Sequence, residues 1–358
     1  TLTMPSTKRR LSTTSFHRST IKHPSKQFST TFLHPSPTVA LLFLTKADHA
    51  HPVLWHTFLK GHDHQFRVFC HPYLPASKRD TTSDGARVLG QQHDSFLHGH
   101  VVANRVVTQW GHIVNAYYAL LDHAYRHAPD AVRFVFLSDT CVPITTADKA
   151  YAALIREPDT TWMDSPRPKD EANRYDHPRS KLDRKPVAPK LRRAGIDRKH
   201  FFKHSGWFAP CRADAGRLVA HREAFRAFNF VSAGDEHILS ILKRSKYANV
   251  CRLVQRPTTY VYWDNARKHK WLLLKRWIWR QYDTATDPAK RKMWEDEIER
   301  CRHAVFHPKE WKDIVTMDDI RAFRARGCLF ARKVVAGCNV DTLCTTINSS
   351  SVHKAARG

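Results

Sequence analysis

The sequence predicts an α/β fold in which a mostly parallel sheet is covered by helices on both faces. Short continuous apolar runs alternate along the chain with segments whose apolar residues recur at helical spacing. An apolar run without polar alternation is typical of a strand buried on both faces, and strand–helix alternation favours parallel pairing. Parallel sheets of this kind bind ligands at the carboxyl ends of their strands, which predicts where a site would lie.

The expected strands follow from the apolar runs. They cover residues 39–44, 66–70, 101–107 and 132–137, with strand-like character at 201–208 and a final basic strand at 329–335. If these strands are parallel neighbours, the residues after them meet at one edge of the sheet. That edge would bring together Thr45, Lys46, His71, Ser138 and Asp139.

Helices are expected between the strands. Pro52, Leu54, Trp55 and Phe58 have helical spacing, and a second stripe runs from Trp110 through Ile113, Val114, Tyr117, Tyr118 and Leu121. Thr145 or Thr146 is placed to cap a further helix. Residues 235–239 open a short helix whose first turn is acidic.

Composition limits the class of protein. The chain has 358 residues, with 42% hydrophobic and 11% aromatic residues, which excludes a wholly disordered chain. No apolar run reaches the roughly 18 to 20 residues of a membrane-spanning helix. Lys and Arg number 59 against 33 Asp and Glu, a formal charge of +26, which predicts an anionic partner.

The pattern of composition divides the chain into four parts. Residues 1–37 contain no acid and are expected to be a disordered stem or targeting segment. Residues 38–336 form the single ordered domain, and 266–301 within it read as a charged helical insertion. Residues 337–358 are expected to be a C-terminal tail. Residues 165–203 are expected to form a long loop over the site.

The eight cysteines contain no Cys-x-x-Cys pair, which argues against a zinc ribbon or a thioredoxin-type site. Cys338 and Cys344 either form a disulfide bond in an oxidising compartment or remain free thiols. Asn348 is a glycosylation acceptor only if the chain is secreted. Gly-x-Gly-x-x-Gly, the Walker loop and His-Glu-x-x-His are all absent, and with 24 histidines the short His clusters at 61–64 and 98–100 are best explained by chance.

Ten motifs, in order, resemble the core-2/I-branching family of glycosyltransferases, especially its plant and algal members. They are LLFLT (41–45), FRVFCHPYLP (66–75), VVTQWGHIVNAYYALL (106–121), FVFLSDTCVPI (134–144), NRYDHPRS (173–180), HSGWFAPCRAD (204–214), DEHILSIL (235–242), TTYVYWDN (258–265), HPKEW (307–311) and CLFARKVV (328–335). Each motif is weak evidence alone, but the ten occur in the family's order and together span nearly all of the chain that is expected to fold.

This resemblance implies a GT-A-like, Rossmann-type sheet in a single catalytic domain. It implies inverting transfer from a UDP-sugar to a glycan hydroxyl, with N-acetylglucosamine as the first choice of sugar and xylose or glucuronic acid as alternatives. Many members need no metal, and no Asp-x-Asp follows a core strand here. No cofactor is therefore expected. The family also implies the lumenal side of the Golgi membrane, a glycan or glycoprotein acceptor, and an anchor that this chain does not show.

Candidate site residues follow from the matched motifs. Inverting displacement needs a base for the acceptor proton and positive charge on the leaving diphosphate. Glu236 matches the family's base. Lys333 is the preferred diphosphate ligand over Arg332, because neighbouring residues of a strand face opposite sides. Lys309 or Lys312 is the expected second cation.

The remaining candidates line the donor and acceptor sides. Trp263 and the Arg174–Tyr175 pair match acceptor positions, where an aromatic face stacks on sugar and Arg supplies paired donors. Ser205, Gly206 and Trp207 match a motif between donor and acceptor, and Trp110 and Asp139 match strand ends. Where the family often has a nucleoside-binding Asp after the second strand, this chain has His71.

Two alternatives stay open at this point. The charge of +26 and the mixed Trp and Arg residues at 267–280 would also suit a polyanion-binding or nucleic-acid-binding protein without transferase activity. Against it, no nucleic-acid-binding motif is present, so a nucleic-acid partner is not expected. The other alternative is a glycan-binding relative without transferase activity, and the presence of Glu236 and Lys333 argues against it.

Overall fold

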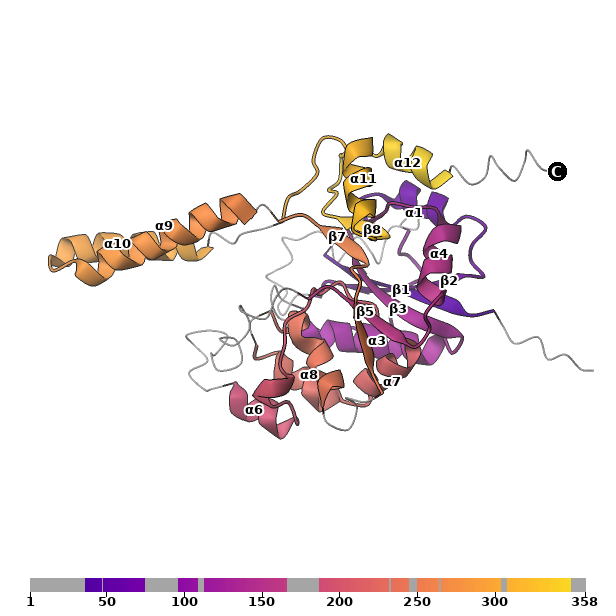
Figure 1. Ribbon diagram of the computed structural model, residues 1–358, viewed down its shortest axis with the longest axis horizontal. Helices are drawn as coiled ribbons and strands as arrows, with labels where there is room; N and C mark the ends of the chain where they lie inside the picture. Colours follow the sequence, from indigo (N-terminus) through magenta and orange to yellow (C-terminus); the bar gives the residue numbers. More distant parts are fainter. Residues whose placement is uncertain are drawn as a thin grey trace, which may run out of the picture. The chain divides into compact units, whose positions relative to one another are not determined.

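A computed structural model describes residues 36–46, 48–74, 96–108, 113–165, 187–231, 233–244, 250–263, 265–303 and 308–348, all within one compact unit (Figure 1). The strands are β1 (Thr38–Thr45), β2 (Phe66–Pro72), β3 (Ala131–Ser138), β4 (Val142–Pro143), β5 (Thr160–Met163), β6 (Arg252–Gln255), β7 (Thr259–Val261) and β8 (Phe330–Arg332). The helices are α1 (Pro52–Leu59), α3 (Val114–His127), α4 (Ala147–Ile155), α6 (Ala188–Arg193), α7 (Arg212–Val219), α8 (Arg222–Phe228), α9 (Asn265–Thr284), α10 (Pro288–His303), α11 (Met317–Ala325) and α12 (Asp341–Asn348), with 3-10 helices η3 (Arg198–His200) and η4 (Gly234–Lys243).

The central sheet is parallel, in the order β2-β1-β3. Leu41 of β1 lies between Val68 of β2 and Val135 of β3, so β1 is the middle strand. Its apolar run is buried on both faces, as the sequence predicts. The α/β class and the parallel pairing are confirmed, and the mixed architecture is consistent with a GT-A-like fold.

Alternate residues of β1 enter two separate hydrophobic cores, because successive strand residues face opposite sides. Val39, Leu41 and Phe43 pack with α1, α4, α11 and α12. Ala40 and Leu42 pack with α3, α6, α7, α8 and η4. Helices therefore cover both faces of the sheet.

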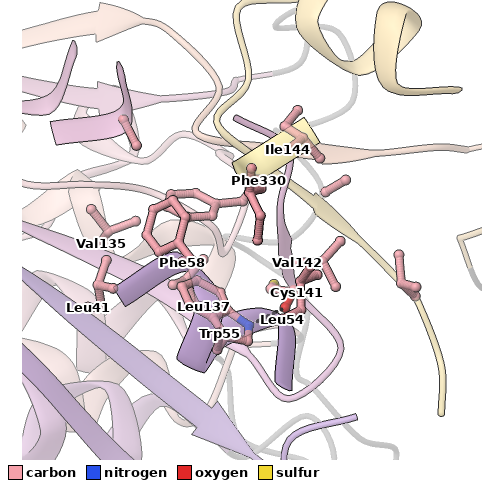
Figure 2. Packing of buried hydrophobic residues seen from close by; sticks show 14 of the residues in the cluster. Leu41, Leu54, Trp55, Phe58, Val135, Leu137, Cys141, Val142, Ile144 and Phe330 are labelled. Carbon is pink, nitrogen blue, oxygen red and sulfur yellow. Dashed lines mark hydrogen bonds between the residues drawn. The ribbon is translucent and has the colours of Figure 1, made fainter. Parts of the chain in front are cut away.

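Trp55 of α1 is one of the fully buried large side chains of the first core (Figure 2). Its ring packs edge-on against Phe43 and stacks on Phe330 of β8, with centroids 5.0 and 5.8 Å apart. The indole N–H donates to the carbonyl of Cys141 at 3.0 Å, which satisfies the buried donor. This core therefore ties α1 to the β3–β4 turn and to the last strand.

A second sheet, in the order β4-β8-β7, follows from this packing. β8 runs antiparallel to β4 and parallel to β7. Just beyond β8, the N–H of Val334 donates to the carbonyl of Thr140 at 3.0 Å. The basic residues at the end of β8 are thereby held beside the carboxyl end of β3.

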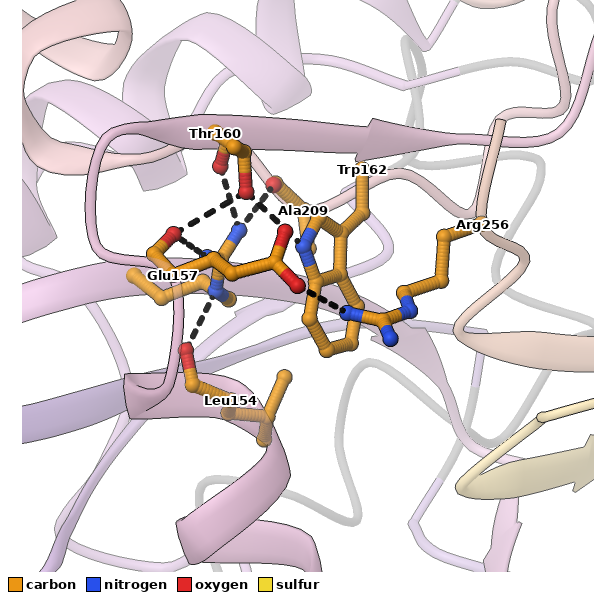
Figure 3. A network of polar contacts seen from close by, with 7 residues as sticks. Leu154, Glu157, Thr160, Trp162, Ala209 and Arg256 are labelled. Atoms are coloured by element: carbon orange, nitrogen blue, oxygen red, sulfur yellow. Dashed lines mark hydrogen bonds and ion pairs between the residues drawn. The ribbon is translucent and has the colours of Figure 1, made fainter. Parts of the chain in front are cut away.

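Arg133 of β3 is fully buried and holds several chain segments together (Figure 3). Its guanidinium donates to the carbonyls of Leu154, Glu157, Thr160 and Ala209 at 2.6 to 3.2 Å. It also lies 4.5 Å from the ring centroid of Trp162. Burial lowers the pKa of Arg133 to about 10, which leaves it charged at neutral pH.

α9 and α10 lie side by side and form a hairpin with its own small core of Ile278 and Ile298 (Figure 1). The segment between β7 and residue 309 is closed at its base, since the N–H of Lys309 donates to the carbonyl of Tyr262 at 2.9 Å. These helices occupy the stretch interpreted from the sequence as a charged helical insertion.

Other helical predictions are also met. α1 spans the first predicted stripe, α3 begins at Val114, and Thr146 caps α4 by accepting from the N–H of Lys149. α12 lies within the stretch expected to be a tail and packs Leu343 and Ile347 into the first core. Of the loop expected at 165–203, residues 166–186 lie outside the described residues, and α6 and η3 follow them.

Two strand predictions are wrong. Residues 101–107 form only an isolated bridge between Val101 and Cys70, and the N–H of Val106 donates instead to Nε2 of His71. Residues 201–208 are irregular, because their backbone bonds to other segments, including the Ser240 hydroxyl and the carbonyl of Asp164. The predicted strand at 329–335 is shorter and ends at Arg332.

Of the two alternatives left open for Cys338 and Cys344, the structure has the free thiols and not the disulfide bond. Cys70, Cys141, Cys211, Cys251 and Cys328 are free thiols as well. Cys338 is buried in the first core, and its Sγ donates to the carbonyl of Asn339 at 3.7 Å. Cys344 is partly buried in α12 against the same core, so apolar packing takes the place of a bridge.

Candidate active site

The carboxyl ends of β1 and β3 meet at Asp139. The N–H of Lys46, just after β1, donates to Oδ2 of Asp139 at 2.9 Å. The N–H of Ala50 donates to the Asp139 carbonyl at the same distance. The loop after β1 is thus fastened to the strand end where the parallel sheet predicts a site.

Arg332 and Lys333 come to the same place from β8. The charge of Asp139 acts on the pKa of both. Strand alternation does not decide between the two cations, because β8 ends at Arg332 and Lys333 lies beyond it. Both basic side chains therefore lie near one carboxylate at the edge of the central sheet.

The guanidinium of Arg332 is buried with incomplete hydrogen bonding. Its guanidinium carbon lies 4.1 Å from the ring centroid of Trp207, and its buried Nε has no hydrogen-bond partner among the described residues. Burial lowers its pKa. A guanidinium with unused donors and a stacked face is well suited to an incoming anion.

Lys333 has one carboxylate beside it. Its Nζ lies 3.6 Å from Oε1 of Glu310, and Oε2 of Glu310 lies 3.8 Å from Nζ of Lys312. Burial and then the charge of Arg332 lower the pKa of Lys333. Lys312 is mostly exposed, while Lys309 packs its Nζ 4.9 Å from the ring centroid of Trp311.

Glu236 lies in the first turn of η4, which begins after Ala233 in the left-handed region (φ 49°). Its Oε2 lies 3.2 Å from Nζ of Lys203, and a quarter of each side chain is exposed. The predicted short helix is therefore present as a 3-10 helix. Its acidic residue is neither buried away from solvent nor a freely solvated cap.

His204 fixes the position of η4. Its backbone N–H donates to the carbonyl of Glu236 at 2.8 Å, and its Nε2 accepts from the N–H of Leu239 at 3.0 Å. Its Nδ1 donates to the carbonyl of Ser205 at 2.7 Å. The ring is fully buried, and burial lowers its pKa to about 4, so it is neutral at physiological pH.

The Tyr117 hydroxyl lies between the acidic and basic groups. It donates to the carbonyl of Gly206 at 3.0 Å. Burial raises the pKa of Tyr117 well above its ordinary value; the nearby charges of Asp235 and Glu236 act in the same direction, and Arg332 opposes them. The structure thus brings η4 and the end of β8 together around one buried hydroxyl.

Gly206 is required by this arrangement. A Cβ at this position would lie 2.9 Å from the Tyr117 hydroxyl oxygen and 3.0 Å from Oδ2 of Asp235. Ser205 and Trp207 are linked by a bond from the Trp207 N–H to Oγ of Ser205 at 3.3 Å. The predicted Ser-Gly-Trp motif therefore adjoins the acidic turn.

His71 is buried at the end of β2. Its Nε2 accepts from the N–H of Val106 at 3.0 Å, which places the ring proton on Nδ1. Nδ1 has no hydrogen-bond partner among the described residues, and burial lowers the pKa of His71 to about 4. The ring offers a neutral N–H in the position where an Asp was expected.

The remaining site residues predicted from the sequence are Trp263, Trp110 and the Arg174–Tyr175 pair. Trp263 follows β7 and is 42% exposed, so it is not ordinary core packing. Arg174, Tyr175 and Trp110 lie outside the described residues. Sequence reasoning missed Lys203 and Glu310 and treated Tyr117 only as part of an apolar stripe. Lys203 directly precedes the HSGW motif and Glu310 lies inside HPKEW, which were the available signals.

The arrangement suits transfer of a group with an anionic leaving portion. The charges of Glu236 and of the buried Arg332 both act on the buried Tyr117 hydroxyl, and Lys333 directly follows Arg332 in the chain. Within the described part of the chain, no group of three or more His, Cys, Asp or Glu side chains could hold a metal ion.

An α/β fold with basic residues at the strand ends is compatible with a group-transfer enzyme. The sequence model of the core-2/I-branching enzyme family matches residues 39–278, and the chain belongs to this family of glycosyltransferases. No curated protein matches the chain in sequence. Family membership confirms the resemblance and favours an enzyme over the polyanion-binding alternative. The family is typical of Golgi enzymes, and it implies a sugar donor and an acceptor.

None of the helices in the described ranges has the length and apolar character that crossing a membrane requires.

Proposed function

We propose that this glycosyltransferase inverts the anomeric centre as it moves a sugar from a UDP-sugar to a glycan hydroxyl, with Glu236 as the base. N-acetylglucosamine is the first choice of sugar, with xylose and glucuronic acid as alternatives. The observation that supports the proposal is that the basic end of β8 lies beside the carboxyl end of β3, the edge where a parallel sheet binds its ligand.

The reaction has a simple balance of bonds and protons. The acceptor oxygen attacks the anomeric carbon while the bond from that carbon to the diphosphate oxygen breaks. The acceptor proton passes to the Glu236 carboxylate, and UDP leaves with the bonding electrons. Because Lys203 lies 3.2 Å from Oε2 of Glu236, the ion pair orients the carboxylate before the proton arrives.

Lys333 and Arg332 are proposed to hold the departing UDP, with Lys312 as an outer cation. Burial and mutual repulsion already disfavour the charge on Lys333. An incoming diphosphate would relieve this repulsion, and the relief would grow as negative charge develops on the leaving group. Fixed cations can thus supply the charge that a metal ion supplies elsewhere, so no metal is expected to be needed.

The donor and acceptor sides are assigned by position. His71 and Asp139, at the ends of β2 and β3, lie where the nucleotide of a parallel α/β enzyme binds. We assign Trp263, Ser205, Gly206 and Trp207 to the acceptor side. Arg174 and Tyr175 stay acceptor-side candidates on their motif alone. The Golgi lumen, a glycan or glycoprotein acceptor and anchorage through a segment not seen here are further parts of the proposal.

The test is UDP release from a panel of UDP-sugars, with and without EDTA. Release from one donor that survives EDTA supports the proposal and identifies the sugar. Glu236→Gln should lower turnover with an acceptor by about 100-fold to 10,000-fold, the usual contribution of a positioned base. The matched control is Glu223→Gln, an exposed carboxylate on α8 that should have no effect.

Lys333→Met should lower turnover by roughly 100-fold or more, as expected for a group that stabilises leaving-group charge. Lys60→Met removes an exposed lysine and serves as its control. Full turnover by Lys333→Met, or activity that EDTA abolishes, would contradict the assignment of UDP to these cations.

A further inference from the structure

The α9 helix carries an unusual number of exposed apolar side chains. Leu273, Leu274, Trp277 and Trp279 are each between 43% and 51% exposed. Single exposed apolar residues are ordinary on a protein surface, but four within seven positions of one helix form a patch. None of these residues belongs to the proposed active site.

Packing within the hairpin does not cover this patch. α10 occupies the stripe of α9 that contains Ile278 and Tyr282. Leu273 and Trp277, four residues apart, form a second stripe. Trp277 makes an edge-on contact with Trp294 of α10, with centroids 5.3 Å apart, and is still 51% exposed. The patch remains open although α9 already has a partner helix.

Positive charge accompanies the apolar residues. Between residues 265 and 284 the sequence has six Lys and Arg residues and a single acid, Asp283. Arg276 and Arg280 are exposed, and neither forms an ion pair with any residue that the structure describes. Elsewhere, surface arginines on α3, α8 and α11 pair with a carboxylate three or four positions away.

We propose that this surface binds the headgroup region of an anionic phospholipid membrane. We call it the α9 outer face, and it consists of Leu273, Leu274, Arg276, Trp277, Trp279 and Arg280. Trp and Leu side chains enter the boundary between headgroups and acyl chains, and Arg side chains bind the phosphates above them. Charge complementarity therefore selects anionic over neutral lipid.

Other partners fit less well. A soluble polyanion would neutralise Arg276 and Arg280 but would leave Leu273 and Leu274 in water. A second copy of the chain would cover the leucines but would bring two strongly basic helices together. The lipid surface is the one partner that satisfies both the apolar and the basic side chains. This inference is argued from the α9 side chains alone and depends neither on the proposed reaction nor on the proposed Golgi lumen.

The experiment is co-sedimentation of the full chain with vesicles of phosphatidylcholine alone or with about one third phosphatidylserine. We expect binding to the anionic vesicles and at least tenfold weaker binding to neutral ones. Arg276→Gln with Arg280→Gln should weaken anionic binding about 25-fold, from roughly fivefold per arginine. Leu273→Ser with Trp277→Ser should weaken it at least tenfold.

Two double variants serve as matched controls. Arg192→Gln with Arg193→Gln removes two exposed charges from α6, and Val53→Ser with Ile314→Ser removes two exposed apolar groups elsewhere. Both should bind vesicles like the unchanged chain. Circular dichroism should show every variant folded, because the substituted side chains lie outside the Ile278–Ile298 core.

Four results would overturn the inference. They are no binding to anionic vesicles, equal binding to neutral vesicles, unchanged binding by the α9 variants, and loss of binding in the controls as well. If the α9 substitutions abolished a dimer or heparin binding while vesicle binding was absent, the face would belong to a different partner.

Discussion

Protonation of His204 should destabilise the folded protein in mild acid. The buried ring accepts the N–H of Leu239 through Nε2, an interaction that only the neutral ring can make. Its pKa is lowered from 6.5 to about 4, chiefly by burial. Between these values the unfolded chain binds more protons than the folded one. Stability is therefore complete above pH 6.5 and falls as the pH drops towards 4.

The magnitude follows from the two pKa values. In full, His204 contributes roughly 3 kcal/mol, since one pKa unit corresponds to about 1.4 kcal/mol. At pH 5 the loss relative to pH 7.5 should be about 2 kcal/mol. His49 and His71 titrate in the same direction, because burial lowers their pKa values to about 3 and about 4.

The assay is urea unfolding of the unchanged chain and His204→Gln at pH 7.5 and pH 5. Gln can accept the Leu239 N–H but cannot be protonated. The variant should lose about 2 kcal/mol less than the unchanged chain between the two pH values, whatever its stability at pH 7.5. His49 and His71 are present in both chains, so their contributions cancel. Equal pH dependence in the two chains would refute the reasoning.

Three other residues give direct tests of the packing and of the proposed site. Arg133→Met should lower the free energy of unfolding by about 3 to 5 kcal/mol in urea, because four carbonyls lose their donor; a loss under about 1 kcal/mol would contradict this role. Gly206→Ala should lower UDP release by roughly tenfold or more, because the new Cβ meets the Tyr117 hydroxyl oxygen. Adding Tyr117→Phe removes that oxygen and should restore part of the UDP release. If the second substitution restores nothing, the steric strain lies elsewhere. Lys203→Met should lower kcat by roughly tenfold through Glu236, while Lys203→Arg should keep most of it; equal kcat for both variants would remove the ion pair from the mechanism.

The central strands could be predicted because their signal is local. β1, β2 and β3 are apolar runs that the sequence displays directly, and burial on both faces requires no knowledge of their partners. The same holds for α3, whose spacing alone indicates the buried face.

The two strand predictions were wrong because the partners of these segments cannot be read from the local sequence pattern. Residues 101–107 and 201–208 are apolar enough for strands, but their peptide groups bond to distant side chains. Val106 donates to His71, and Phe202 donates to the Ser240 hydroxyl. These partners lie 35 and 38 residues away and become neighbours only after folding.

The site shows the same division between local and distant information. Motifs in order were enough to propose Glu236, Arg332 and Lys333, because each lies in a recognisable stretch of sequence. Tyr117 carries no such mark, since its spacing on α3 is that of any core residue. Its burial could be predicted, and a buried hydroxyl needs a partner, but that partner is the carbonyl of Gly206, 89 residues away.

Tyr117 also links catalysis to the packing of the core. Its ring packs on Phe136 of β3 with centroids 4.6 Å apart, while its hydroxyl lies beside Gly206. Substitutions on the sheet-facing side of α3 would therefore move the hydroxyl relative to the acidic turn and to Arg332. Such changes should lower turnover even where they leave Glu236 and Lys333 in place, because the contact with Phe136 positions the hydroxyl beside Gly206.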